Sequence, residues 1–471
     1  MAELHDLTAA EQAAAVRRGE VSPVDLVEHY LDRIARLDGE LGAFVTVTDE
    51  AARVQAKEAE RAVRSGAPLP PLHGVPTAIK DLALTAGVPT AFGSRALRGF
   101  VPVVDASVVT ALRAAGTISL GKTTTSEFGL VPHGETDLGS ETRNPWDLTR
   151  SAHGSSAGAA AAVAAGLVPF AHAGDGGGSI RLPAGACGLV GLKASRDRVF
   201  AGPLPSDVGG LAIEGAITRT VRDAALALDA LAVANPGALT VLRRPAGTFA
   251  DCAAAEPGRL RIGRYVRLST DAGADADAVA AYEAAGAALV AAGHEVSEVE
   301  LAVEPSFVDA FVVLWAVTAA ALPVPAEREP LLRPVTRWLR DRGRQVGATE
   351  LVAARAAVET VSRRVVAATA GYDAVLSPTA PFAARPIGWF TESGDPEQEF
   401  DRAVEFAAYA PLQNATGQPA ISLPVHRTDG GLPVGVTLTG RPADEGTLLR
   451  LGAQLERELG WHRHTSPMWR S

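Results

Sequence analysis

The chain has 471 residues, of which 47% are hydrophobic and 21% are charged, with a formal net charge of −10 at pH 7. A chain of this length and composition can bury a large core, so we expect a globular protein. The acidic balance, without any basic block, argues against nucleic acid or an anionic membrane as a partner.

The cysteines and the apolar runs exclude several further classes. Cys187 and Cys252 are too few for a disulfide framework, and no cysteine–histidine cluster has the spacing of a metal site. We therefore expect a cytoplasmic protein without a metal or other cofactor. The first residues lack the basic and apolar regions of a secretory signal. The longest apolar run, residues 310–322, is shorter than the roughly 18 residues that span a bilayer, which predicts a buried helix or a pocket wall.

Helices and strands are expected to alternate in the first half of the chain. Ser22, followed by Pro23 and Asp25, forms a capping box that predicts the start of an amphipathic helix. After a proline-rich break at residues 68–74, a short strand is predicted to end near Lys80. A helix over residues 106–115, a strand over residues 117–120 and an alanine-rich helix over residues 158–165 follow. The alanine-rich helix has no polar face, so we expect it to be buried between layers.

The second half continues this alternation. Residues 260–266 predict a strand, an alanine-rich helix that Gly293 ends follows it, and residues 294–301 predict another strand. The succession indicates an α/β architecture. Residues 236–259 contain glycine and proline and show little periodicity, so a long surface connection is expected there.

Lysine is rare in this chain. Only Lys57, Lys80, Lys122 and Lys193 are lysines among the 44 basic residues. Arginine stays charged in proteins, whereas a buried lysine can lose its proton near neutral pH. A site that needs a neutral amine cannot accept arginine, so each lysine is a candidate functional residue.

Two short motifs match patterns of other enzyme classes. Residues 116–123 match a P-loop letter for letter, but a helix is predicted before them and a strand within them, which is the reverse of what a phosphate site needs. The G-S-S-A-G motif of residues 154–158 matches a nucleophile elbow with Ser156 as nucleophile, although the segment upstream is a poor strand. A Ser-His-Asp hydrolase that uses Ser156 stays as the less favoured alternative.

A third candidate site combines Lys80 with Ser155 and Ser179. The two serines flank the predicted buried helix, so both can emerge on one side of a packed layer. Neutral Lys80 could act as a general base, and one serine could pass the proton on. The glycine run Gly176, Gly177 and Gly178 offers backbone N–H groups for an oxyanion hole, where each good donor contributes on the order of 3 kcal/mol.

At these residues the sequence resembles the amidase signature family of serine hydrolases. The resemblance rests on G-V-P-T-A-I-K-D-L, G-K-T-T-T-S-E-F-G, H-G-S-S-A-G, G-D-G-G-G-S-I-R-L-P-A and G-Q-P-A-I-S-L-P, and it covers most of the chain. It implies a single domain over residues 1–471, with an α/β fold whose central twisted mixed sheet is covered by helices on both faces. The implied parts are an N-terminal helical part (1–65), a signature core (66–235), a variable substrate-pocket region (236–371) and a C-terminal part of the core (372–471).

The resemblance also implies a role for each site residue. Lys80 becomes the base, Ser155 the bridging serine, joined by a cis peptide bond to the residue that follows it, and Ser179 the acylated nucleophile. The amides from Gly176 to Ser179 become the oxyanion donors. Asp175 and Arg181 are expected to hold the nucleophile loop, with Arg181 also a candidate substrate contact.

The chain departs from the family pattern at the first serine motif. The usual G-G-S-S-G-G-S is written H-G-S-S-A-G-A, which introduces His153, Ala157 and Ala159. None of these changes removes a catalytic hydroxyl or the amine. His153 is a candidate substrate contact that could narrow the site.

The implied activity is hydrolysis of a linear carboxylic amide through an acyl-enzyme, with a small-molecule amide as the partner. Activity near neutrality requires burial to lower the lysine pKa by roughly three units. The apolar run 311–322 hints at an apolar substrate group or, equally, at ordinary core. Two alternatives stay open: the glutaminase component of a transfer-RNA amidotransferase, which requires partner subunits, and a catalytically dead binding protein. The sequence leaves the oligomeric state open, and a homodimer is one of the states it allows.

Overall fold

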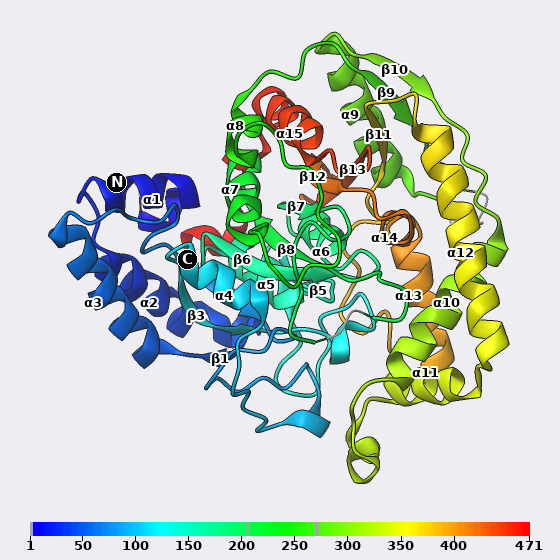
Figure 1. Ribbon diagram of the computed structural model, residues 1–471, viewed down its shortest axis with the longest axis horizontal. Coiled ribbons are helices and arrows are strands. Elements are labelled where there is room, and N and C mark those ends of the chain that lie inside the picture. Colours follow the sequence, from blue (N-terminus) through cyan, green and yellow to red (C-terminus); the bar gives the residue numbers. More distant parts are fainter. Residues whose placement is uncertain (1–2, 205–206, 269–272) are drawn as a thin grey trace.

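A mixed β-sheet runs through the molecule in the computed structural model, which describes residues 3–204, 207–268 and 273–471 (Figure 1). Within these ranges eleven strands form one sheet in the order β1-β3-β2-β6-β8-β7-β12-β13-β11-β9-β10, and β4 and β5 form a separate ribbon. The strands are β1 (Phe44–Val47), β2 (Pro76–Lys80), β3 (Ile118–Thr123), β4 (Arg143–Asn144), β5 (Asp147–Ser151), β6 (Phe170–Asp175), β7 (Val190–Lys193), β8 (Ile213–Thr218), β9 (Arg261–Arg264), β10 (Glu295–Glu298), β11 (Ala374–Pro378), β12 (Ala420–Arg427) and β13 (Pro433–Gly440).

Helices cover both faces of this sheet, which confirms the predicted fold class. On one face α4, α7, α8, α9 and α15 share a core with the strands, and α2, α3, α5 and α6 pack on the other. Helices α10 to α13 form a lobe beside the sheet (Figure 1). The helices are α1 (Ala9–Arg17), α2 (Pro23–Leu41), α3 (Asp49–Ser65), α4 (Ser107–Ala114), α5 (Ala157–Ala164), α6 (Arg181–Ala186), α7 (Val221–Leu231), α8 (Phe249–Ala254), α9 (Ala276–Ala291), α10 (Pro305–Ala320), α11 (Pro334–Gln345), α12 (Ala348–Thr369), α13 (Pro396–Ala407), α14 (Pro411–Thr416) and α15 (Glu445–Leu459).

Local sequence signals set the elements that carry the site. Helix α2 begins where the capping residue predicts, because the Ser22 hydroxyl accepts a hydrogen bond of 3.0 Å from the N–H of Val24. Every residue of α5 is buried, as its alanine-rich sequence without a polar face requires. Strand β3 covers most of the P-loop look-alike and follows α4, so a nucleotide site is excluded there.

One prediction about local structure held only in part, and another was wrong. Residues 236–248 and 255–259 do form a connection outside helices and strands. The segment expected to be a long surface connection contains α8, whose Thr248 and Asp251 form a capping box and whose Phe249 is buried. The Thr-x-x-Asp signal was present in the sequence but covers only one short helix. The segment before the G-S-S-A-G motif contains β5, which pairs with β4 outside the central sheet. Because a strand does precede the motif, only the contacts of Ser156 can decide whether it is a nucleophile.

The apolar run 310–322 lies largely within α10, where Phe307, Phe311 and Leu314 are buried. The run is therefore a helix with one buried face, in line with the prediction of a buried helix or a pocket wall. No helix in the described ranges combines the length and the apolarity that crossing a membrane requires. Both cysteines are buried and unpaired.

Candidate active site

The sheet brings Lys80 and the glycine run to one edge. Strands β2 and β6 are neighbouring and parallel, with Ala78 opposite Ala171, and they end at Lys80 and Asp175. Because the carboxyl ends of parallel strands meet at the same edge, the Lys80 side chain and the loop after Asp175 lie together there. Helix α5 starts on this edge, directly after Ser155 and Ser156.

Lys80 is a buried amine in contact with a hydroxyl. Its Nζ donates hydrogen bonds to the Ser155 Oγ at 2.7 Å and to the Gly174 carbonyl at 3.1 Å, and the residue is 1% exposed. Burial lowers the pKa of Lys80 to about 8, while the carboxylates of Glu214 and Asp175 act in the opposite direction. A substantial fraction of the amine is therefore neutral at mildly alkaline pH, as a general base requires.

The other three lysines have different surroundings. Lys57 is exposed on α3. Lys122 is buried among the Ala83 carbonyl and the hydroxyls of Thr85 and Thr90, with the Asp81 carboxylate at 3.8 Å. Lys193 is buried at the end of β7 and donates to the Ala194 carbonyl at 3.0 Å. Of the four lysines, Lys80 alone contacts a candidate site hydroxyl.

Ser155 lies between Lys80 and the loop of Ser179. The cis peptide bond is Gly154–Ser155, so it precedes Ser155, whereas the family resemblance implied that it follows this serine. Gly129, with φ of +73°, makes room beside this serine, since a Cβ there would lie 3.2 Å from the Ser155 Oγ. The N–H of Ser156 donates to the Ser179 carbonyl at 3.3 Å and holds the two serine segments together.

The two hydroxyls of the candidate relay are not directly bonded. Among the described residues no hydrogen bond joins the Ser155 and Ser179 side chains, and the Ser155 Oγ is bonded to Lys80. Ser156 is fully buried, and its hydroxyl donates to the Gly174 carbonyl at 3.2 Å. This geometry disfavours Ser156 as a nucleophile because its oxygen is enclosed and, in the described chain, contacts no histidine.

The carboxylate of Asp175 organises the loop that carries Ser179. Asp175 accepts hydrogen bonds from the N–H groups of Gly178 at 2.7 Å and Ile180 at 3.2 Å. The expectation that Gly178 donates to an oxyanion is therefore wrong, since its N–H already binds this carboxylate. In the described chain the N–H groups of Gly176, Gly177 and Ser179 have no hydrogen-bond partner, so these three donors stay available.

Arg181 supports the loop and does not face the pocket. It is fully buried, forms a two-pronged ion pair with Asp175 at 2.9 and 3.0 Å, and also donates to Gln413 at 2.6 Å and Asn414 at 2.7 Å. Burial opposes ionisation of Asp175, but Arg181 outweighs it and holds the pKa of that carboxyl well below its usual range. The candidate substrate contact through Arg181 is not supported, because its guanidinium is taken up by these partners.

Two residues of α14 that contact the loop were not predicted from the sequence. The Asn414 side-chain amide donates to the Asp175 carbonyl at 2.8 Å and to the Asp175 carboxylate at 2.9 Å. Gln413 and Asn414 stand in the run P-L-Q-N-A-T, directly before the G-Q-P motif, where two adjacent amides in a buried stretch were an available signal. Their distance along the chain from Asp175 hid the contact.

His153 is part of the core. It is fully buried, its ring stacks on Phe406 with centroids 4.0 Å apart, and its Nε2 accepts from the N–H of Arg385 at 3.0 Å. Burial lowers the pKa of His153 to about 3. The prediction that His153 touches substrate was wrong, since the residue lies between aromatic rings and is absent from the pocket lining.

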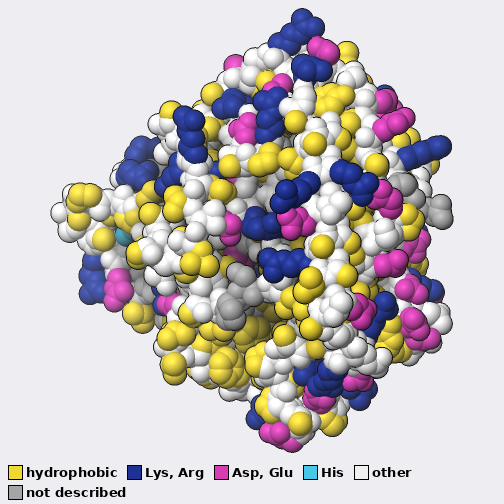
Figure 2. All heavy atoms as spheres, turned by 45° about the vertical axis from the view of Figure 1, so that its right-hand side comes forward, with side chains coloured by type: hydrophobic (Ala, Val, Ile, Leu, Met, Phe, Trp, Pro, Cys, Tyr) yellow, Lys and Arg dark blue, Asp and Glu magenta, His cyan; other side chains and the backbone are white. Residues whose placement is uncertain are grey.

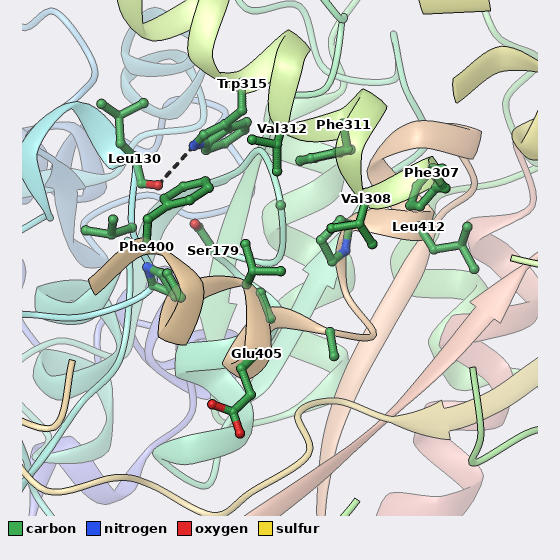
Figure 3. Close-up of a pocket in the computed structure, with 18 of the residues that line it drawn as sticks. Leu130, Ser179, Phe307, Val308, Phe311, Val312, Trp315, Phe400, Glu405 and Leu412 are labelled. Carbon is green, nitrogen blue, oxygen red and sulfur yellow. Dashed lines mark hydrogen bonds between the residues drawn. The ribbon is translucent and has the colours of Figure 1, made fainter. Parts of the chain in front are cut away.

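An apolar pocket of about 150 Å³ opens at Ser179 (Figure 3). Trp315, Phe311 and Val312 of α10 form one wall, and the Trp315 indole donates to the Leu130 carbonyl at 3.0 Å. A Cβ on Gly176 would lie 3.0 Å from the Trp315 ring, so the indole rests directly on the glycine loop. The remaining lining includes Leu130, Val131, Phe307, Val308, Phe400, Ala403, Val404, Ala408 and Leu412.

The pocket offers almost no charge to a ligand. Glu405 is the one charged residue in its described lining, and in Figure 3 its carboxylate points away from Ser179. A larger cleft of about 650 Å³ lies between α12 and α14, with Arg196, Arg355 and Arg363 in its lining but not Ser179. Figure 2, which turns the α12 side forward, shows Lys and Arg side chains gathered beside a hollow on that face. The apolar pocket, and not this cleft, adjoins the candidate nucleophile.

One group in the described chain has the composition of a metal site, and it lies near the N-terminus. It consists of Glu3, His5 and His29. The His5 Nδ1 and His29 Nε2 are 2.9 Å apart, with ring centroids at 5.1 Å and ring planes within 15°, so the two nitrogens point at each other and share a hydrogen. Two nitrogens that bind one tetrahedral ion at about 2.0 to 2.1 Å lie about 3.3 Å apart, so the separation of 2.9 Å is that of a hydrogen bond.

This chain is similar to known proteins over nearly its full length. The family model described as Amidase matches residues 25–449. The putative amidase AmiB2 of Mycobacterium bovis is 39% identical over 97% of this chain and 97% of its own length. A glutamyl-tRNA(Gln) amidotransferase subunit of Roseiflexus sp. RS-1 is 35% identical over 98% of both chains. The solved structure of 6-aminohexanoate cyclic dimer hydrolase with its substrate has a TM-score of 0.92 and 31% identity, over 99% of this chain and 100% of that chain.

Proposed function

Because the chain belongs to the amidase signature family, we propose that it hydrolyses an uncharged carboxylic amide through an acyl-enzyme on Ser179. The observation that carries this proposal is the 2.7 Å hydrogen bond from the buried Lys80 amine to Ser155, beside a loop with free backbone donors. Lys122 and Lys193 are buried as well, but only Lys80 has a hydroxyl partner that adjoins the loop of Ser179, and a perturbed amine beside such a loop is typical of a functional site.

The proposed reaction moves one proton along two hydroxyls. Neutral Lys80 takes the proton of Ser155 as the Ser155 oxygen takes that of Ser179, and the Ser179 Oγ attacks the amide carbonyl. The proton returns by the same route to the departing amine. Water then repeats the sequence on the acyl-enzyme and releases the acid. Rotation of the Ser179 side chain toward Ser155 is required, since the two hydroxyls are not bonded in this structure.

The oxyanion of the tetrahedral intermediate is assigned to the amides of Gly176, Gly177 and Ser179. Asp175 and Arg181 fix the loop, so these donors are already oriented before substrate binds. Preorganised donors stabilise developing charge without reorganisation, at about 3 kcal/mol for each good donor.

The pocket favours a substrate with an apolar group beside the scissile amide. Aromatic and aliphatic side chains line it, and no cation is present in its described lining. Glutamine brings a carboxylate and an ammonium group, and each would lose water there without a partner. A free-standing amidase therefore fits this chain better than a glutaminase component of a larger complex, despite the 35% identity to an amidotransferase chain.

A screen of amides tests the function. Purified protein and its Ser179→Ala variant are assayed with linear acyl anilides of increasing chain length, the cyclic dimer of 6-aminohexanoate, and glutamine. We expect turnover of apolar linear amides by the wild type, none by the variant, and no release of ammonia from glutamine. Release of ammonia from glutamine that depends on partner subunits would support the amidotransferase role instead. Activity that survives Ser179→Ala would overturn the assigned nucleophile.

A further inference from the structure

His172 and Glu214 form a hydrogen-bonded pair next to the backbone of Lys80. They lie on β6 and β8, and neither has a role in the proposed reaction. His172 of β6 accepts a hydrogen bond at its Nδ1 from the backbone N–H of Lys80, at 3.3 Å. Its Nε2 lies 2.9 Å from the Glu214 carboxylate on the neighbouring strand β8. Since Nδ1 accepts a hydrogen, the ring hydrogen is on Nε2, where it is donated to Glu214.

Glu214 lies beside the carbonyl that holds the Lys80 amine. Gly174 and Glu214 are directly opposite each other in the β6–β8 pair, and a Cβ on Gly174 would lie 3.1 Å from the Glu214 carboxylate. The Gly174 carbonyl accepts the second hydrogen bond of Lys80. The carboxylate is thus built into the surroundings of the base, although it does not touch the amine.

Few other charges face this amine. Helix α5, which packs on β2, carries no titratable side chain. Strand β3 contributes Lys122, whose amine is bonded to Ala83, Thr85 and Thr90 and lies 3.8 Å from the Asp81 carboxylate. Helix α2 contributes Arg33, which is bonded to the carbonyls of Ala165 and Gly166. The charges that act on Lys80 are the carboxylates of Asp175 and Glu214. Asp175 is neutralised by its two-pronged pair with Arg181, which leaves Glu214 as the carboxylate without a cationic side chain bonded to it.

We propose that Glu214, held by His172, is a positioning residue that sets the pH at which Lys80 becomes a base. Its negative charge favours the ammonium form of Lys80 and so raises the pH needed for activity. Burial alone would carry the amine to a lower pKa, where it is neutral but a weak base. The inference rests on the proposed function, because it concerns the pH at which Lys80, the proposed base, loses its proton.

The sign of the effect follows from the charge. Activity needs neutral Lys80, so it rises with pH through the lysine pKa, which is about 8. When Glu214 becomes Gln, the ammonium form loses its nearby carboxylate and gives up its proton more readily. The rise in activity should move to lower pH by on the order of one pH unit, the size expected for one carboxylate that acts on a buried amine without touching it.

The test measures how fast a fluorophosphonate modifies Ser179 between pH 5.5 and pH 10, in wild type and Glu214→Gln. This readout does not depend on knowing the substrate. We expect the midpoint of the rate profile to fall by about one pH unit in the variant, whereas a change that only loosened the site would lower the rate at every pH without moving the midpoint. An unmoved midpoint, or one that moves to higher pH, would overturn the inference.

The matched control is Glu456→Gln. Burial raises the pKa of Glu456 to about 8, so its carboxyl titrates in the same pH range, but it lies on α15 and does not act on Lys80. The control should keep the wild-type midpoint. If the midpoint moved as far in Glu456→Gln as in Glu214→Gln, the shift would come from the net charge of the protein, which would overturn the role of Glu214.

Two further measurements keep the inference testable if Glu214→Gln does not fold. Glu214→Asp retains the charge and should keep its midpoint near that of wild type, so a shift to lower pH as large as one unit would contradict the inference. In addition, the chain contains only four lysines, so isotope labelling of lysine yields few NMR signals. In the Asp variant the Lys80 signal should titrate at the midpoint of the rate profile, and a titration elsewhere would overturn the assignment. If Ser179 is not labelled in wild type at any pH, the proposed function fails, and not this inference alone.

Discussion

Contact with the Ser155 hydroxyl distinguishes Lys80 from the other lysines, because Lys122 and Lys193 are also buried but bond to other groups. The Lys80 amine is enclosed at the end of β2 and bonded to Ser155, whereas Lys57 is exposed on α3. Arginine cannot serve at position 80 because a guanidinium keeps its proton in proteins. The rarity of lysine in this chain is consistent with a chemical requirement at that position.

Replacement of Lys80 tests this residue directly. We expect Lys80→Met and Lys80→Arg to lower kcat/KM by about 10² to 10⁴-fold, the usual contribution of a general base. Lys57→Met, which removes an exposed amine, should keep wild-type activity. Steady-state kinetics with an apolar anilide measures the difference, and an active Lys80→Arg enzyme would refute the base assignment.

Asn414 offers a second test at the residue scale. Asn414→Ala removes two hydrogen bonds to Asp175 and one to the Leu211 carbonyl, so the loop that orients the oxyanion donors loses support. We expect kcat to fall on the order of 10²-fold, since small misplacements of a reacting group have effects of that size. Asn235→Ala, in an exposed loop, is the control. An unchanged kcat in a folded Asn414→Ala protein would show that the loop needs no such support.

The residues that the sequence could identify are those with local signatures. Lys80, Ser155 and Ser179 each stand within a recognisable run, and the structure brings Lys80 to Ser155 and the Ser179 loop to Ser156. His172, Glu214 and Asn414 act through contacts between separate strands or helices, which no local pattern encodes. The N–H of Gly178 was misassigned because an aspartate three residues earlier competes for it.

At the scale of elements, α5 packs between layers and so places Ser155 and Ser156, which directly precede it. All eight of its residues are buried and six are alanine, so the helix approaches the sheet closely. Gly158 in this helix is essential to the approach, since a Cβ there would lie 2.2 Å from the Ala43 carbonyl. Small side chains in α5 are therefore a packing requirement as well as a helix signal.

Overfilling this layer should destabilise the protein. Ala160→Leu adds three carbons at a fully buried position, and overpacking of this kind typically costs about 1 to 3 kcal/mol. Ala356→Leu, on the exposed side of α12, should change stability by less than about 0.5 kcal/mol. Urea unfolding measures both. Equal stability of the two variants would show that the layer around α5 can accommodate a larger side chain, contrary to this account.

Helix α10 contributes Trp315 to the pocket wall, next to Gly176, and we expect this residue to limit the size of the substrate. Trp315→Ala opens space next to Gly176. We therefore expect the ratio of kcat/KM for a longer acyl chain to that for a shorter one to rise about tenfold or more, because each methylene group that a hydrophobic pocket accommodates changes kcat/KM by about that factor. Trp389→Ala removes a similar half-buried indole outside the pocket and should leave this ratio unchanged. An unchanged ratio in Trp315→Ala would assign substrate to another surface.

Elements with strong local signals were predictable, and those with weak ones were not. The cap at Ser22 and the apolar face of α2 fixed that helix, and the alternation after residue 260 fixed β9, α9 and β10. Helix α8 was missed because six residues are too few to show a helical period. Strand β5 was missed because most of its residues are polar and only partly buried.

At the scale of the whole molecule, the sheet joins distant parts of the chain around one edge. Strand β12, near the C-terminus, pairs with β7, and α14 reaches back to the loop after β6. The motifs could predict a mixed sheet through family resemblance, but the strand order depends on contacts between residues far apart in sequence. Such long-range pairing is invisible to periodicity, which reports only which face of an element is buried.

The central claim concerns the whole site: a neutral Lys80 activates Ser179 through Ser155. The most direct measurement is the rate of Ser179 modification by a fluorophosphonate across pH, in wild type and Lys80→Met, with the adduct located by peptide mass spectrometry. The account predicts an adduct on Ser179 whose rate rises with pH through a single ionisation near pH 8 and drops at least 10²-fold in the variant. An adduct on Ser156, or an equal rate in Lys80→Met, would contradict it.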